Sequence, residues 1–157
     1  LGYYGGLRVG TIAGLLLGDV IDAQGNVKDS ALLDGSIMKG GKQYQAYFNN
    51  EKLVSAISKY INDSRKPTKV QNLLVTRKDT AYTPKSLSAL MEKKFKDFGF
   101  VGCSMHSLRR TYASRIVENG GDITLLRSLM NHTSITTTAI YVENDPVVLR
   151  KMVASID

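Results

Sequence analysis

The spacing of the apolar residues changes along the chain, and this change is the strongest constraint on its fold. Between residues 20 and 48 the apolar runs are short and are separated by glycines. Short runs divided by turn residues are typical of a small antiparallel sheet, here with a hairpin tip at 39–42. From Asn50 onward the apolar residues recur at helical spacing. The sequence therefore predicts an α+β fold that is mostly helical, with a small sheet near the N-terminus packed against a helical core.

The same pattern predicts the individual elements. Thr83 followed by Pro84 combines an N-cap with a first-turn proline, and Gly99 ends the helix that these residues begin. Glycines and polar residues mark the ends of the other helices. We expect helices at 9–17, from 50 until 65–67, at 83–98, 106–119 and 122–130, and from 146 onward, and extended segments at 20–21, 31–33, 37–38, 44–48 and 73–75.

Composition narrows the class of protein. The 157 residues are 43% apolar, which is enough for one compact domain with its own core. The 21 Lys and Arg residues outnumber the 14 Asp and Glu residues, and the resulting charge of +7 favours a polyanionic partner. Cys103 is the only cysteine, which excludes an internal disulfide, an all-cysteine zinc site and a C-x-x-C redox motif. A reducing, intracellular compartment is therefore favoured.

Two further features of the sequence concern membrane association and the start of the chain. The most densely apolar stretch, residues 9–18, is far shorter than the roughly 20 residues that cross a bilayer, so we expect a soluble protein without a membrane partner. The chain starts at Leu1 without a methionine, and its first residues resemble the end of an element already begun. We therefore expect residues 1–157 to form a single domain of a longer chain.

The first of the two histidines lies near an arginine that is suited to phosphate binding. His106 and Arg109 are three positions apart, so on a helix they share one face. A guanidinium binds phosphate oxygens as a rigid fork, and an imidazole accepts or donates a proton near neutral pH. On its own, however, a His-x-x-Arg pair more often marks a solvated helix face.

The second histidine, His132, lies in a predicted turn between helices. Asn131 before it tolerates left-handed backbone angles, and Ser134 can cap the next turn. Tyr141 follows nine residues after His132. A single histidine in a turn and a single tyrosine are usually structural, so these residues gain meaning only as a set.

Together these residues resemble the catalytic domain of the tyrosine recombinases, the phage integrase family. The segment Gly6-Leu7-Arg8-Val9 resembles the first arginine motif of that family. The segment Lys39-Gly40-Gly41-Lys42 resembles its sheet-hairpin lysine, with Lys39 at the matching position. The likeness covers nearly the whole chain in order, and it implies catalytic roles for Arg8, Lys39, His106, Arg109, His132 and Tyr141.

The resemblance implies an enzyme that cuts and rejoins DNA without a metal or another cofactor. Tyr141 would attack phosphorus to form a covalent 3′-phosphotyrosine. The best candidate base for its phenol is His106, and Lys39 would protonate the departing 5′ oxygen. Arg8, Arg109 and His132 would stabilise the charge of the transition state. Lys42 and Arg110 would contact the DNA beyond the reacting phosphate.

The family also implies partners. We expect a double-stranded DNA attachment site as substrate and a DNA-binding domain upstream in the longer chain. The apolar stripe at 146–157 either packs on its own domain or docks on a neighbouring copy in a homotetramer on synapsed DNA. A cytoplasmic, nucleoid-associated protein of bacterial, phage or mobile-element origin is expected.

Two positions depart from the family pattern. Thr11 stands where an acidic residue usually braces the first arginine, and Asn131 stands where glycine usually precedes the second histidine. The sequence leaves two alternatives to a site-specific recombinase. One is a type IB topoisomerase, which uses the same chemistry without exchanging strands. The other is an integrase relic that binds DNA without cutting it.

Overall fold

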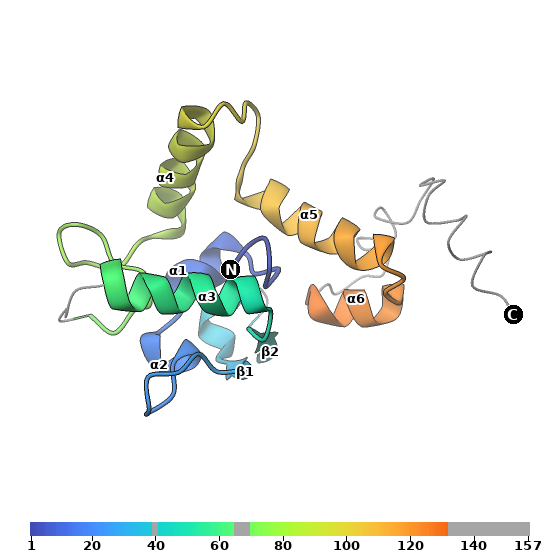
Figure 1. The fold of residues 1–157 in the computed structure, drawn as a ribbon, viewed down its shortest axis with the longest axis horizontal. Helices are drawn as coiled ribbons and strands as arrows, with labels where there is room; N and C mark the ends of the chain where they lie inside the picture. Colours follow the sequence, from blue (N-terminus) through green and yellow to red (C-terminus); the bar gives the residue numbers. More distant parts are fainter. Residues whose placement is uncertain (39–40, 65–69, 132–157) are drawn as a thin grey trace, which may run out of the picture.

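The computed structural model describes residues 1–38, 41–64 and 70–131 (Figure 1). The helix expected from 146 onward lies outside these residues. Within them, helices predominate over strands, and the predicted α+β class is confirmed. The helices are α1 (Val9–Gly14), α2 (Leu17–Val20), α3 (Glu51–Lys59), α4 (Pro84–Asp97), α5 (Met105–Glu118) and α6 (Ile123–Leu129), the short turns are η1 (Gly35–Ile37) and η2 (Tyr60–Ser64), and the strands are β1 (Ser30–Leu33) and β2 (Tyr44–Tyr47).

The small sheet is the predicted antiparallel pair. β1 and β2 align from Ser30 opposite Tyr47 to Leu33 opposite Tyr44. Side chains alternate between the two faces, so the cross-strand partners Leu33 and Tyr44 are both buried, whereas Tyr47 is exposed. The sheet therefore presents one apolar face to the core, and Tyr44 lies on that face.

The connection between the strands is longer than the tight hairpin suggested by the sequence. The side chain of Asp34 accepts a hydrogen bond from the Ser36 N–H, and this bond starts the 3-10 turn η1. Ile37, expected to be extended, therefore ends this turn, whereas Met38 has the expected extended backbone angles but belongs to neither strand. The prediction of an extended segment at 37–38 was wrong at Ile37, because a local side-chain bond starts a turn there.

The predicted helix at 9–17 is divided into α1 and α2. Leu15 accepts a hydrogen bond from the Leu73 N–H at 2.7 Å, and Leu17 donates one to the Gln71 carbonyl at 2.7 Å. This strand-like pairing draws Leu15 and Leu16 out of helical geometry. Long-range backbone bonds thus override the local helical pattern.

Two of the predicted extended segments are also not strands. Val20 ends α2, and Ile21 forms only an isolated bridge with Val27. Residues 73–75 form no strand in the described part of the chain, although the neighbouring Asn72 bridges Leu16 and Val75 bridges Ala81.

The helices of the second half follow the prediction closely. Thr83 caps α4 through the Ser86 N–H, and α4 ends before Gly99, whose φ of 81° only glycine adopts readily. Asp122 caps α6 by accepting hydrogen bonds from two N–H groups of its first turn. The helices expected at 83–98, 106–119 and 122–130 are therefore confirmed as α4, α5 and α6.

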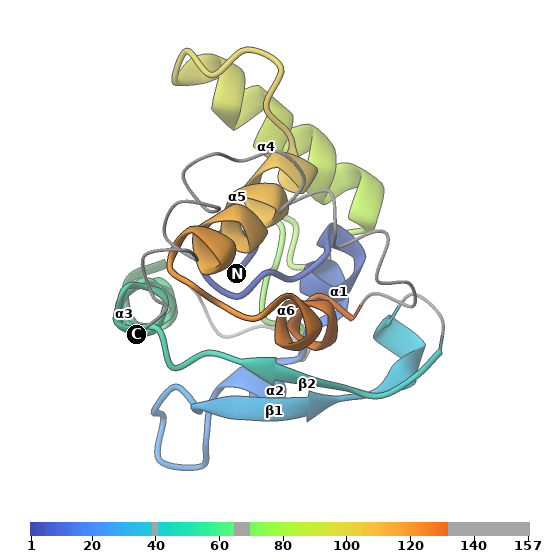
Figure 2. The same cartoon turned by 90° about the vertical axis from the view of Figure 1, so that its right-hand side faces the viewer.

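The buried side chains form two clusters of unequal size. The larger cluster gathers α1, the sheet and α3 around fully buried residues such as Leu7 and Phe48. The smaller cluster joins α5 to α6 through Ala113, Val117, Leu126 and Met130. In Figure 2, which looks along α6, the helix lies between the β1–β2 ribbon and α5. The position of α6 thus depends on a few apolar contacts and on the bonds at its end.

This arrangement makes a prediction for neighbouring leucines of α6. Leu126 is fully buried and Leu125 is 66% exposed. Leu126→Ala should lower the free energy of unfolding by about 2–5 kcal/mol because it opens a cavity under α6. Leu125→Ala should lower it by less than about 0.5 kcal/mol. Urea unfolding measures both, and equal losses would contradict the described packing of α6.

Candidate active site

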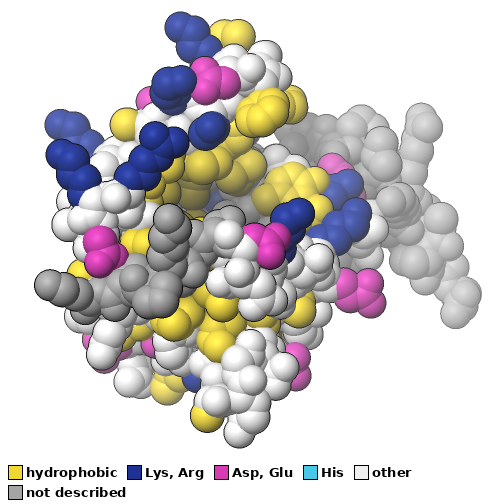
Figure 3. Space-filling model, turned by 60° about the vertical axis from the view of Figure 1, so that its left-hand side comes forward, with side chains coloured by type: hydrophobic (Ala, Val, Ile, Leu, Met, Phe, Trp, Pro, Cys, Tyr) yellow, Lys and Arg dark blue, Asp and Glu magenta, His cyan; other side chains and the backbone are white. Residues whose placement is uncertain are grey.

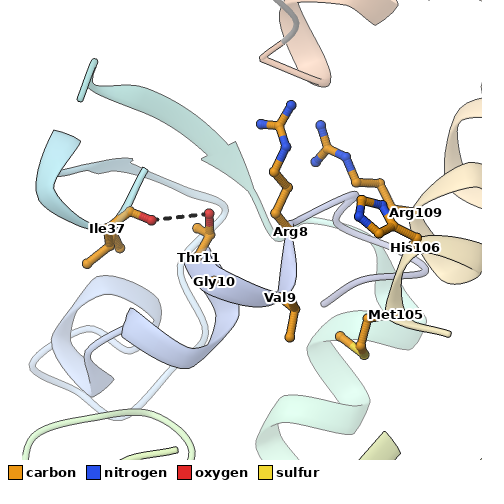
Figure 4. A pocket seen from close by; sticks show the side chains of 8 residues that line it. All are labelled: Arg8, Val9, Gly10, Thr11, Ile37, Met105, His106 and Arg109. Carbon is orange, nitrogen blue, oxygen red and sulfur yellow. Dashed lines mark hydrogen bonds between the residues drawn. The ribbon is translucent and has the colours of Figure 1, made fainter. Parts of the chain in front are cut away.

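Three of the predicted catalytic residues line one pocket. Arg8, His106 and Arg109 surround a cavity of about 230 Å³, together with Val9, Gly10, Thr11, Ile37 and Met105. Figure 4 shows the two guanidinium groups side by side and pointing the same way, with the imidazole of His106 beside Arg109. Arg8 comes from the start of α1 and the other two from α5. The predicted shared face of His106 and Arg109 is therefore observed.

Arg109 is a buried cation that is fixed by backbone oxygens. Its side chain is only 6% exposed. One terminal nitrogen donates to the Gly6 carbonyl and the other to the Met130 carbonyl. Burying a charge is costly unless polar groups replace the lost water, and these carbonyls supply part of that replacement. The guanidinium is therefore oriented by the main chain on two sides.

Gly6 combines a left-handed backbone, which glycine adopts without strain, with a position that has no room for a side chain. Its φ is 61°, in the left-handed region, and a Cβ added there would lie 2.5 Å from two ring atoms of Tyr112. The absence of a side chain allows the Tyr112 ring to lie against the backbone whose carbonyl binds Arg109. Gly6 is thus a structural support of the pocket.

Arg8 is held by the residue after Met130. Its two terminal nitrogens donate to the Asn131 carbonyl at 3.5 and 3.4 Å. Asn131 has a φ of 44°, which confirms that this position requires the left-handed angles expected from the sequence. Asparagine thus supplies here the backbone geometry for which glycine is the usual residue.

The end of α6 is the common acceptor of these bonds. The Tyr44 hydroxyl donates to the Leu129 carbonyl, so three consecutive carbonyls, at 129, 130 and 131, each accept from a different side chain. The last carbonyls of a helix lack intrahelical donors and carry a partial negative charge. Here the phenol and Arg109 bind the carbonyls of Leu129 and of the C-cap Met130, and Arg8 binds the carbonyl that follows. The next residue in the sequence is His132.

Tyr44 is protonated at any pH near neutrality. Burial is the main cause that raises the pKa of its phenol to about 12, and the nearby Tyr112 raises this pKa as well. Its hydroxyl therefore remains a hydrogen-bond donor to Leu129. Sequence reasoning missed this residue: the strand pattern at 44–48 contained a signal that Tyr44 faces inward, but nothing that identified its acceptor 85 positions away.

Thr11 does not take over the role of the acidic residue expected at its position. It is 2% exposed, and its hydroxyl donates to the Ile37 carbonyl at 3.4 Å and contacts the Met38 sulfur at 3.5 Å. Thr11 thus ties α1 to the segment that precedes Lys39. Arg8 obtains a partner from the Asn131 carbonyl instead.

The remaining predicted residues are not brought to the pocket in the described part of the chain. Arg110 is exposed on α5, Lys42 is exposed before β2, and neither lines the pocket. Lys39, His132 and Tyr141 lie outside the described residues. Among residues 1–38, 41–64 and 70–131 there is no group of three or more His, Cys, Asp or Glu side chains able to hold a metal. The helices of the same ranges are all too short or too polar to cross a membrane.

The support given by Gly6 is testable with a pair of glycine variants. Gly6→Ala should lower the free energy of unfolding by about 2–4 kcal/mol, because it adds backbone strain and a collision with Tyr112. Gly25 has a φ of 88° but open space around its Cα, so Gly25→Ala should cost only about 1–2 kcal/mol of strain. Urea unfolding gives both values. A Gly6→Ala variant no less stable than Gly25→Ala would contradict the contact.

Known proteins are similar to this chain in sequence and fold. A Rickettsia conorii protein, tyrosine recombinase XerD, is 26% identical over 148 residues, which cover 88% of this chain and 48% of that protein. The crystal structure of XerA recombinase superimposes with a TM-score of 0.78 and 26% identity over 97% of this chain and 54% of that one. The Tn1549 transposon integrase, solved in complex with transposon right end DNA, shares the fold at 18% identity and a TM-score of 0.68, over 98% of this chain and 56% of that one.

The chain thus spans about half the length of the proteins that it matches. The sequence profile described as the phage integrase family matches residues 1–147. This match extends over both arginines of the pocket, the strand pair and the end of α6. The chain therefore belongs to the phage integrase family of tyrosine recombinases.

Proposed function

We propose that this chain is the catalytic domain of a site-specific DNA recombinase or integrase that acts through a covalent 3′-phosphotyrosine. The observation that supports it most is the pairing of Arg8 and Arg109 in one pocket beside His106. The two arginines come from opposite ends of the described chain, and the fold brings their guanidinium groups together. Two fixed cations facing one cavity suit an anion with several oxygens, such as a phosphodiester.

The chemistry of strand cleavage fits this arrangement. In phosphoryl transfer the negative charge spreads over the nonbridging oxygens, so two preorganised guanidinium groups stabilise the transition state. The two carbonyl bonds of Arg109 fix its orientation before substrate arrives, and the longer bonds of Arg8 to the Asn131 carbonyl, at 3.4 and 3.5 Å, orient its guanidinium toward the same cavity, which limits reorganisation during the reaction. His132 adds a further donor in the proposed mechanism.

Proton transfer completes the proposed reaction. Tyr141 attacks phosphorus, and the bond from phosphorus to the 5′ oxygen breaks. His106 accepts the phenol proton, for which its exposed imidazole at the pocket rim is accessible. Lys39 gives a proton to the departing 5′ oxygen. Rejoining is the same reaction in reverse, and the phosphotyrosine link conserves the energy of the broken bond, so no nucleotide cofactor is required.

Double-stranded DNA is the proposed substrate. The charge of +7 favours it, and the similar transposon integrase was solved on DNA. Lys42 and Arg110 are both exposed, as DNA contacts beyond the reacting phosphate need to be. Figure 3 shows Lys and Arg side chains gathered on the upper part of the molecule. The exposed cations of α4 and of the loop before it are Arg77, Lys78, Lys85, Lys93, Lys94 and Lys96.

The proposal extends to the whole protein. Residues 1–157 form its catalytic domain, and a separate upstream domain helps to hold the DNA. Recombination exchanges strands between two duplexes, so we propose a homotetramer on synapsed DNA in which the segment 146–157 contributes to the contacts between copies. The protein would act in the cytoplasm, on the DNA of a bacterium, phage or mobile element.

Covalent trapping tests the proposed function. The full-length protein is incubated with a suicide duplex nicked beside its own attachment site, in buffer that contains a metal chelator. The unmodified protein should form an adduct that survives denaturing electrophoresis. Tyr141→Phe should abolish the adduct, because phenylalanine lacks the nucleophilic oxygen. Tyr47→Phe is the control, since Tyr47 is exposed on β2 and does not line the pocket.

Each contrary result has a separate meaning. An adduct that persists in Tyr141→Phe would contradict Tyr141 as the nucleophile. Loss of the adduct in chelator would contradict metal-independent chemistry. Binding of the duplex by the unmodified protein without any adduct would contradict the recombinase and favour a DNA-binding relic.

A further inference from the structure

Tyr44 is connected to the arginine pocket without lining it. The residue lies on β2, its side chain is 9% exposed, and its hydroxyl donates to the Leu129 carbonyl. The next two carbonyls accept from Arg109 and Arg8. Three separate parts of the fold, namely the sheet, α5 and the start of α1, therefore converge on one helix end.

The three donors differ in what they do when a phosphate enters the pocket. Arg8 and Arg109 line the pocket, so under the proposed function the same guanidinium groups that hold the helix end also bind the DNA phosphate. A guanidinium carries five N–H donors, so an arginine that keeps its bond to a carbonyl of the 129–131 segment still has donors for a phosphate. The carbonyls of Met130 and Asn131 therefore orient the two guanidinium groups while they bind the phosphate. Tyr44 does not line the pocket, so its hydroxyl holds the helix end without contacting the substrate.

α6 depends on contacts from outside the helix to stay in place, which makes the hydrogen bond from Tyr44 to its last carbonyl important. α6 has only seven residues, and its buried contacts with α5 come from Leu126 and Met130. A short helix is not stable alone and depends on tertiary contacts. The Tyr44 bond links its last turn to β2, on the side opposite α5, so the helix end is fixed from two directions (Figure 2).

We propose that Tyr44 is a positioning residue for DNA cleavage: its hydroxyl fixes the end of α6 to the sheet, so that Arg109 and Arg8 stay aligned while they bind the phosphate. This inference rests on the proposed function. The phenol suits this role because it is neutral. Its hydroxyl donates a hydrogen bond to the Leu129 carbonyl and transfers no proton in the reaction. Tyr44 is also the first residue of β2 and lies two positions after Lys42.

Tyr44→Phe removes only the hydroxyl and keeps the ring that packs in the core. In the full-length protein, single-turnover adduct formation on the suicide duplex should slow by about tenfold or more, because the arginines are no longer aligned. The affinity for the intact duplex should stay within about threefold, because phosphate contacts over the whole site dominate it. Amide hydrogen exchange at 126–131 should become faster as the helix end loosens.

Two controls separate positioning from other roles. Tyr47→Phe, on the same strand with an exposed side chain, should leave adduct formation and exchange unchanged. The pH profile of adduct formation should keep its shape in Tyr44→Phe, since Tyr44 transfers no proton in this proposal. Loss of one limb of that profile would overturn the positioning role, because it would make Tyr44 an acid or a base.

Other outcomes are equally decisive. An unchanged adduct rate in Tyr44→Phe overturns the proposal, and so does a loss of affinity that equals the loss of rate, since that indicates a merely structural role. If the unmodified protein forms no adduct, the proposed function fails. Hydrogen exchange then still tests the anchor, because unchanged exchange at 126–131 in Tyr44→Phe overturns it without any DNA.

Discussion

The carbonyl groups at the end of α6 determine how the candidate site is built. Helix ends leave their last carbonyls without intrahelical partners, and in this protein Tyr44 and Arg109 bind two of them, at Leu129 and Met130, while Arg8 binds the next carbonyl, at Asn131. The arrangement solves two physical problems at once. It satisfies the end of a short helix, and it surrounds two cations, one of them buried, with oxygens that fix their direction.

The rest of the described fold supports these bonds. Gly6 allows its carbonyl to reach Arg109 because it has no side chain to collide with Tyr112. Thr11 fastens α1 to the segment before Lys39. The small α5–α6 cluster brings the helix end within reach of the sheet. A chemically simple pair of arginines therefore depends on glycine geometry, a buried hydroxyl and apolar packing.

Much of this could be predicted from the sequence where local rules decide. The Thr83-Pro84 pair located the start of α4, short apolar runs between glycines located β1 and β2, and helical spacing placed His106 and Arg109 on one face. The sequence predictions failed where backbone bonds to residues far away in the sequence determine the local structure. Pairing with residues 71–73 divided the helix expected at 9–17. The acceptors of Tyr44 and Thr11 are equally invisible in a linear pattern, since only the folded chain brings them into contact.

The central claim is that Arg8 and Arg109 act on one phosphate as a unit, and a double-mutant cycle tests it most directly. Arg8→Lys and Arg109→Lys keep the charge but lose the fixed fork of donors. We predict that each slows single-turnover adduct formation by about 100-fold or more, and that the double variant is little slower than the slower single variant. Two losses that simply multiply would show that the arginines act independently, and would contradict this account.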